Sequence, residues 1–92
     1  MNKAELVASM AEKSGLTKKD AESALNAFME SVQDALVKEE KVQLVGFGTF
    51  EVRHRKARKG RNPRNPNEVI EIPASKAPVF KAGKTLKEAV NK

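Results

Sequence analysis

Apolar positions in the first part of the chain recur every three to four residues, which is the period of an α-helix. Leu6, Val7 and Met10 mark a first helix, and Asn2 is a residue type that caps helix starts well. Gly15 follows the last apolar position and suits the left-handed conformation that ends many helices. The pattern therefore predicts a short helix between Asn2 and Gly15.

A second apolar stripe covers about four helical turns and ends in a charged stretch at residues 38–41. Thr17 is placed to cap this helix, and Asp20 adds negative charge to its first turn, where the helix dipole favours it. A stripe of this width needs another surface to pack against. Its members are Ala21, Leu25, Phe28, Val32 and Leu36.

The hydrophobic period changes from helical to alternating at Val42. Residues 42–45 predict a short strand, and residues 49–55 alternate between apolar and charged side chains, as a half-buried strand does. Gly46-Phe47-Gly48 between them predicts a tight turn that carries a buried phenylalanine. A phosphate-binding loop is not indicated, because a third glycine and a following helix are both missing.

The second half of the chain predicts a long β-hairpin over residues 53–76, with turn-forming residues at 62–67. Almost no bulky apolar residue lies between Arg53 and Glu68, so this hairpin cannot pack a core and should project from the body. Residues 77–81 predict a further strand, in which Pro78 favours an edge or a bulge. A short helix is expected over residues 84–91.

Composition limits what so short a chain can do. It has 92 residues with no Cys, no Trp, no Tyr and a single histidine, His54. Disulfides and thiolate metal sites are therefore excluded, and a zinc site made by protein ligands alone is not expected. Chains of this size bury little apolar surface, so we expect a partner subunit to complete the core. No arrangement of residues indicates an enzyme, and His54 is expected to face solvent on the hairpin.

Charge is divided unequally between the two halves. Residues 1–40 have a net charge of −3 and residues 41–92 a net charge of +9, which together give +6. Seven basic residues and no acid occupy the segment from Arg53 to Arg64. Cations that alternate along a strand can follow the phosphates of a nucleic acid. A disordered basic linker or a targeting patch is the alternative, but strand-like flanks argue against disorder.

Pro63 lies at the expected tip of the hairpin, among Arg61, Asn62 and Arg64. Proline at such a position is commonly a turn residue only. A rigid apolar ring surrounded by cations also fits a wedge that enters the minor groove between base steps and bends DNA. The residues alone leave both readings open.

Taken together, these segments closely resemble the bacterial histone-like proteins of the HU/integration host factor (DNABII) family. The resemblance extends from Met1 to about Val90, and its most specific stretch runs from Gly46-Phe47-Gly48-Thr49-Phe50 through the arginines to Asn62-Pro63. It implies an α+β fold in an intertwined homodimer, with a helical base, a β-saddle and two protruding β-hairpin arms.

The resemblance also implies one domain over residues 1–92 and roles for its parts. Residues 1–40 would form the helical dimerisation base, residues 41–82 the β-saddle with the arm at 53–76, and residues 83–91 the C-terminal helix. The expected dimer core consists of Phe28, Val32, Leu36, Leu44, Phe47, Phe50 and Phe80. The expected DNA contacts are Arg53, Arg55, Arg58, Lys59, Arg61, Asn62, Pro63 and Arg64 on the arm, and Lys3, Lys81 and Lys84 on the body.

One segment departs from the family pattern. The family usually has Thr-Gly after Asn62-Pro63-x, whereas this chain has Asn65-Pro66-Asn67. Glycine takes positive φ angles most easily, and Pro66 removes a backbone donor, so the geometry of the arm tip becomes an open question.

The function implied is binding, wrapping and bending of double-stranded bacterial DNA without sequence specificity, which compacts the nucleoid. Bent, nicked or gapped DNA should be preferred because its deformation requires less energy. Two alternatives stay open: a site-specific architectural protein like integration host factor, and a basic module that binds RNA or an acidic protein. No metal, cofactor, membrane contact or small-molecule substrate is expected. The absence of a signal-like or membrane-spanning apolar run predicts a cytoplasmic, nucleoid-associated protein.

Overall fold

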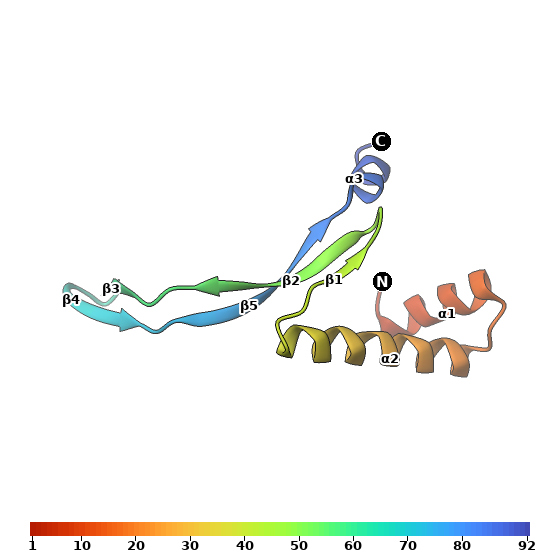
Figure 1. Ribbon diagram of the computed structural model, residues 1–92, viewed down its shortest axis with the longest axis horizontal. Helices are drawn as coiled ribbons and strands as arrows, with labels where there is room; N and C mark the ends of the chain where they lie inside the picture. Colours follow the sequence, from red (N-terminus) through yellow and green to blue (C-terminus); the bar gives the residue numbers. More distant parts are fainter.

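A computed structural model describes all residues, 1–92, and they form an α+β fold, as the sequence predicts. Figure 1 shows two limbs that meet at an angle, with a long β-hairpin projecting from the region where they join. One limb contains the first two helices, and the other contains strands that lead to the last helix. The helices are α1 (Lys3–Ser14), α2 (Lys18–Val37) and α3 (Lys84–Val90). The strands are β1 (Val42–Leu44), β2 (Gly48–Arg55), β3 (Arg58–Asn62), β4 (Asn65–Ile72) and β5 (Ser75–Ala82).

The first two helices begin and end at residues that the sequence marks. Asn2 Oδ1 accepts a hydrogen bond from the Glu5 amide at 2.9 Å, and Thr17 Oγ1 accepts one from the Asp20 amide at 3.1 Å. Each bond satisfies a donor that the first helical turn leaves free. Gly15 has a φ angle of +76° after α1, so the predicted left-handed helix end is confirmed.

The strands form two separate antiparallel ladders. β1, β2 and β5 make a three-stranded sheet in the order β1-β2-β5, and β3 pairs with β4 alone. β5 is thus an edge strand, and Pro78 lies opposite Val52 in an unbroken register, which confirms the predicted edge position. The turn before β2 is closed by the Phe47 amide, which donates to the Leu44 carbonyl at 2.9 Å.

The two sides of the hairpin predicted over residues 53–76 do not pair as one unbroken ladder in the structure. The ladder of β2 and β5 ends at the pair Arg55 and Ser75, and the ladder of β3 and β4 starts at Arg58 and Ile72. Between them the chain holds Pro73, which has no amide hydrogen to donate. The arm, residues 53–76, therefore consists of two ladders in series.

A single chain leaves most of its apolar surface open. The radius of gyration is 19.0 Å, compared with about 12 Å for a compact chain of this length. The accessible surface is 7884 Å², compared with about 5,300 Å² for a compact 10.1 kDa monomer. The buried apolar residues are Val7, Ala11 and Ala21, where α1 packs on α2.

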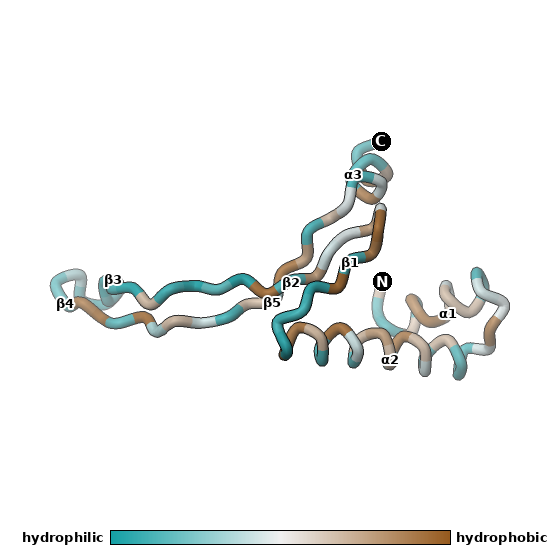
Figure 2. Tube along the Cα trace, viewed as in Figure 1, coloured by the Kyte–Doolittle hydropathy of each residue, from teal (hydrophilic) through white to brown (hydrophobic).

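None of the seven residues expected in a dimer core is buried within the single chain. Phe47, expected to be buried in its turn, is 50% exposed here, and Phe28 and Phe80 are each 41% exposed. Figure 2 shows that hydrophobic residues line α2 and the strands that meet it, whereas the arm is mainly hydrophilic along β3. The chain thus has an apolar surface that it does not cover by itself.

Candidate nucleic-acid interface

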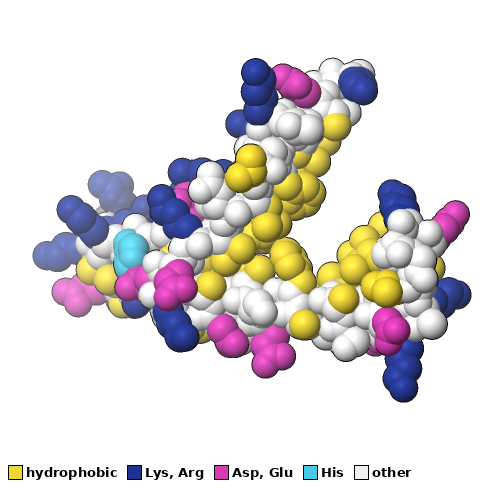
Figure 3. All heavy atoms as spheres, turned by 45° about the vertical axis from the view of Figure 1, so that its right-hand side comes forward, with side chains coloured by type: hydrophobic (Ala, Val, Ile, Leu, Met, Phe, Trp, Pro, Cys, Tyr) yellow, Lys and Arg dark blue, Asp and Glu magenta, His cyan; other side chains and the backbone are white.

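The arm carries a dense set of cations with no acidic partners. All seven basic residues between Arg53 and Arg64 are exposed, and none of them lies within 4.0 Å of a carboxylate. Figure 3 shows Lys and Arg side chains projecting from the arm in several directions. Their charge is therefore available to an external polyanion. The seven are Arg53, Arg55, Lys56, Arg58, Lys59, Arg61 and Arg64.

The register of the three-stranded sheet divides its residues between two faces. Gln43, Thr49 and Lys81 are opposite one another, as are Val42, Phe50 and Phe80. Because side chains alternate along a strand, each set defines one face. The charged face carries Lys41, Glu51, Arg53, Arg55 and Lys81. The apolar face carries Val42, Leu44, Phe50, Val52 and Phe80, and it extends to His54, Lys76 and Pro78.

Glu51 holds two lysines on the charged face. Its carboxylate lies 2.8 Å from Lys81 Nζ and 3.6 Å from Lys41 Nζ, so the central strand is bridged to both edge strands. The hydrogen bond from Lys81 lowers the pKa of Glu51 most, desolvation raises it by less than that bond lowers it, and the charges of Lys81 and Lys41 lower it further. Lys81, for which the family resemblance implies DNA contact, is therefore paired within the protein while 65% of its side chain stays exposed.

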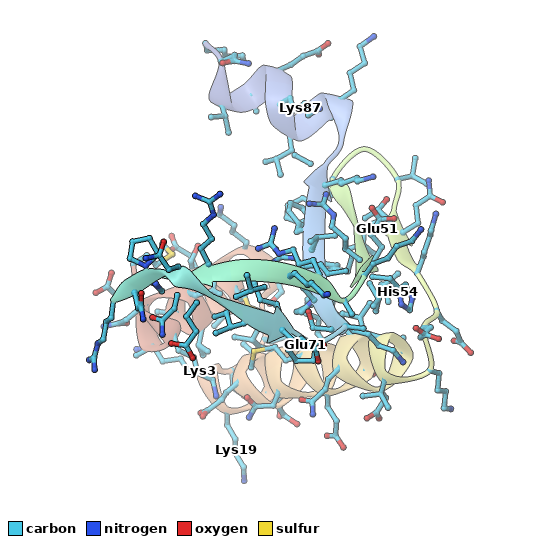
Figure 4. The ribbon with its side chains drawn as sticks, turned by 90° about the vertical axis from the view of Figure 1, so that its left-hand side faces the viewer. Lys3, Lys19, Glu51, His54, Glu71 and Lys87 are labelled. Atoms are coloured by element: carbon cyan, nitrogen blue, oxygen red, sulfur yellow. The ribbon has the colours of Figure 1, made fainter.

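His54 is exposed on the arm, as expected, with 62% of its side chain open to solvent, and it also makes a contact that the sequence did not indicate. Its Nε2 lies 2.8 Å from Glu39 Oε1. In Figure 4, His54 lies at the foot of the arm, close to the end of α2, and Glu51 lies further along the strands. His54 belongs to the apolar face, opposite to that of Arg53 and Arg55, which is why its partner comes from the helix side.

The arm tip is a turn built around Pro63 and Arg64, with Asn62 and Asn65 paired on either side. Positive φ angles are confined to Gly15, Glu39 and Gly46, so no tip residue has one. The tip residues all have negative φ angles, which suit a proline at the second position of the turn, so the turn closes without a glycine. Pro63 is exposed.

The same side-chain hydrogen bond occurs twice at the arm tip. Asn62 Oδ1 accepts from the Arg64 amide at 3.0 Å, and Asn65 Oδ1 accepts from the Asn67 amide at 3.3 Å. Both are turns in which asparagine bonds to the backbone two residues on, and each encloses a proline. Asn62 Nδ2 also donates to Glu68 Oε2 at 3.2 Å, which links the two sides of the tip.

The apolar face borders a hollow of about 520 Å³ between α2 and the strands. The aromatic rings form a chain along it: Phe28 and Phe50 are 6.3 Å apart, Phe50 and Phe80 4.8 Å, and Phe47 and Phe80 5.7 Å. In Figure 3, hydrophobic side chains cover the inner sides of both limbs. Six of the apolar residues that line the hollow are Phe28, Met29, Val32, Leu36, Phe50 and Val52.

The remaining predicted contacts come from separate elements. Lys3 begins α1 and Lys84 begins α3, and these helices lie on different limbs of the molecule (Figure 1). Lys41 was not among the predicted contacts, although it lies two positions before Gln43 and so falls on the charged face by strand alternation. Lys56 was not among them either, although it belongs to the same basic run as the arm arginines.

No helix is long and apolar enough to span a membrane. A small, open α+β body with a projecting cationic hairpin defines a class of proteins that present a β-arm to a polyanion. The sequence matches the family described as bacterial DNA-binding protein over residues 1–91, and the chain belongs to this family.

Individual relatives are similar to this chain over nearly its whole length. A DNA-binding protein HU from Clostridium pasteurianum is 72% identical over 92 residues, which is the full length of both proteins. A second DNA-binding protein HU, from Geobacillus stearothermophilus, is 61% identical over 90 residues, covering 98% of this chain and 99% of that protein. A cocrystal structure of Anabaena HU with DNA is 53% identical, with a TM-score of 0.88 over 98% of this chain and 97% of that one.

Proposed function

We propose that the protein binds double-stranded DNA without sequence specificity and bends it, as a histone-like component of the bacterial nucleoid. The observation that carries this proposal is the arm, whose seven exposed cations have no acidic partner and surround a proline tip. The HU relatives support the same function, and they are DNA-binding proteins and not enzymes. Location in the cytoplasm, on the nucleoid, follows from this function.

The binding form of the protein is a homodimer. Two chains together expose roughly 5,200 Å² more than two compact monomers of their mass, an area at the upper end of the range that obligate dimers bury. Phe28 and Phe50 line the open hollow, and Phe80 packs against Phe50, so a second copy would cover all three rings. Residues 1–40 then serve as the dimerisation base, residues 41–82 as the saddle with the arm at 53–76, and residues 83–91 as the closing helix.

Affinity and bending come from different parts of the arm. Arginines and lysines replace the counterions of the phosphates, which favours binding to any sequence. The Pro63 ring, held by the turn of Asn62, enters the minor groove and separates two base pairs. Two arms, one from each subunit, then bend the duplex toward the saddle, where Lys81 and Lys84 meet its flanks together with Lys3.

Replacement of Pro63 tests the bending step. Pro63→Ala keeps the arm cations but removes the rigid ring, so we expect a smaller bend and a weaker preference for nicked over intact duplex. Fluorescence energy transfer across a labelled duplex measures the bend, and competition between the two duplexes measures the preference. Pro66→Ala, the matched change at the second Asn-Pro of the tip, should affect both less. If Pro63→Ala leaves bend and preference unchanged, Pro63 is only a turn residue.

A further inference from the structure

Glutamate occupies a backbone position at the end of α2 that usually belongs to glycine. The Glu39 amide donates to the Leu36 carbonyl and the Glu40 amide to the Ala35 carbonyl, both at 2.9 Å. These two bonds make a Schellman motif, whose left-handed residue is most often glycine. Glu39 has a φ angle of +61° and is the one non-glycine residue of the chain with positive φ.

A side chain in this conformation is strained, and such strain persists where the residue is needed for another reason. The contacts of the Glu39 carboxylate provide such a reason. Its Oε1 lies 2.8 Å from His54 Nε2 and 3.4 Å from Lys76 Nζ. His54 and Lys76 are cross-strand partners on β2 and β5, one pair before this ladder ends. The arm root is formed by residues 53–55 of β2 and residues 75–77 of β5, which pair with each other. One oxygen of Glu39 therefore connects both strands of the arm root to the end of α2.

We propose that Glu39 is a positioning residue that anchors the arm root to α2, and that the anchor strengthens as His54 becomes protonated. This inference rests on the proposed function. Histidine is the side chain whose charge ordinarily changes between pH 5 and 8. When His54 is protonated, two cations share one carboxylate, and when it is neutral only Lys76 pairs with Glu39. An anchored arm loses less freedom on binding DNA, so affinity should rise as pH falls through this range.

No other carboxylate competes for His54. In the loop after α2, Lys38 and Glu40 make no ion pair, and Lys41 pairs with Glu51 on the opposite face of the sheet. Asp34 on α2 also makes none. Arg53 and Arg55 flank His54 in β2 but belong to the charged face, and on β5 the facing cation is Lys76. The pH response therefore depends on Glu39.

The test measures duplex affinity at pH 6 and pH 8, at one salt concentration, for wild type, Glu39→Gln and Glu40→Gln. Glu40→Gln removes the same charge at the adjacent position in the sequence without removing an ion pair. Wild type and Glu40→Gln should bind about two- to fivefold more tightly at pH 6, the effect of one exposed ion pair. Glu39→Gln should lose most of this difference. If Glu39→Gln keeps the full difference, His54 acts on DNA directly and the anchor is refuted.

A DNA-free measurement separates failure of the anchor from failure of the proposed function. Hydrogen exchange, expressed as protection factors, reports the order of the arm-root amides at residues 53–55 and 75–77. Protection should fall in Glu39→Gln and in Glu39→Gly, although glycine relieves the strain at the end of α2. Unchanged root protection in Glu39→Gly would mean that the residue only ends a helix. Wild type that fails to bind duplex refutes the function, while the exchange data still decide on the anchor.

Discussion

Glu51 is the one acidic side chain on the charged face of the sheet, and its two lysines make its ionisation part of the stability of the fold. Lys81, and then Lys41, hold the pKa of Glu51 below its ordinary value of 4.5. A carboxylate with a lowered pKa in the folded state stabilises that state above its unfolded pKa, and this contribution disappears as pH falls through the folded pKa. The stabilisation is therefore complete at neutral pH and is lost below about pH 4.5.

Acid titration of the melting temperature checks this assignment. Wild type should lose stability more steeply than Glu51→Gln between pH 6 and pH 3, because the variant has no ionised partner for Lys81 to lose. Glu71→Gln is the control, since Glu71 lies on β4 and makes no ion pair. Parallel curves for wild type and Glu51→Gln would show that the two lysine contacts do not stabilise the protein.

At the scale of elements, the arm should set the salt dependence of DNA binding. Each phosphate that a cation neutralises contributes about 0.9 to the slope of log affinity against log salt. Arg58→Ala with Arg61→Ala removes four cations from a dimer, so the slope should fall by up to about 3.6. Fluorescence anisotropy from low to moderate salt measures it.

The matched control for the arm is Lys18→Ala with Lys19→Ala, which removes the same charge from the first turn of α2. Lys19 points away from the strands in Figure 4. This control should change affinity slightly and leave the slope close to that of wild type. Equal slopes for the arm variant and wild type would exclude these arginines from the phosphate contacts.

Helix and strand boundaries could be predicted from the sequence where they are determined by interactions between neighbouring residues. Asn2, Gly15 and Thr17 mark helix ends through hydrogen bonds and φ angles that involve only a few neighbouring residues. The gap between the two arm ladders was missed, although Pro73 marks it, because strand alternation on either side suggests continuity. The closure of the tip without glycine depends on the negative φ angles of Pro63 and Arg64, which composition and period do not give.

The candidate site was only partly predictable, because its contacts join residues far apart in the chain. The basic run identified the arm cations, which are consecutive in sequence. The pairing of Glu51 with Lys41 and Lys81 depends on strand register, and the contact of His54 with Glu39 depends on how the arm meets α2. Neither register nor arm direction can be read from composition or period alone.

At the scale of the whole molecule, folding and association should be one event. A chain that buries only Val7, Ala11 and Ala21 among its apolar residues has too little core for a stable monomer. The hollow beside Phe50 must therefore be filled by a second copy before the helical limb and the strand limb are held together. For an obligate dimer, stability depends on protein concentration by mass action.

Sedimentation and thermal melting test this coupling together. Wild type should have about twice the 10.1 kDa mass of one chain, and its melting temperature should rise with protein concentration. Phe50→Ala removes a ring that contacts both Phe28 and Phe80, and truncations of this kind in a packed core cost about 3–5 kcal/mol, here once per subunit. The variant should melt far lower and dissociate at micromolar concentration.

Val69→Ala, on the exposed arm, should match wild type in both measurements. A 10.1 kDa species with sharp, concentration-independent melting would contradict the dimer, and the two-armed bending of DNA with it.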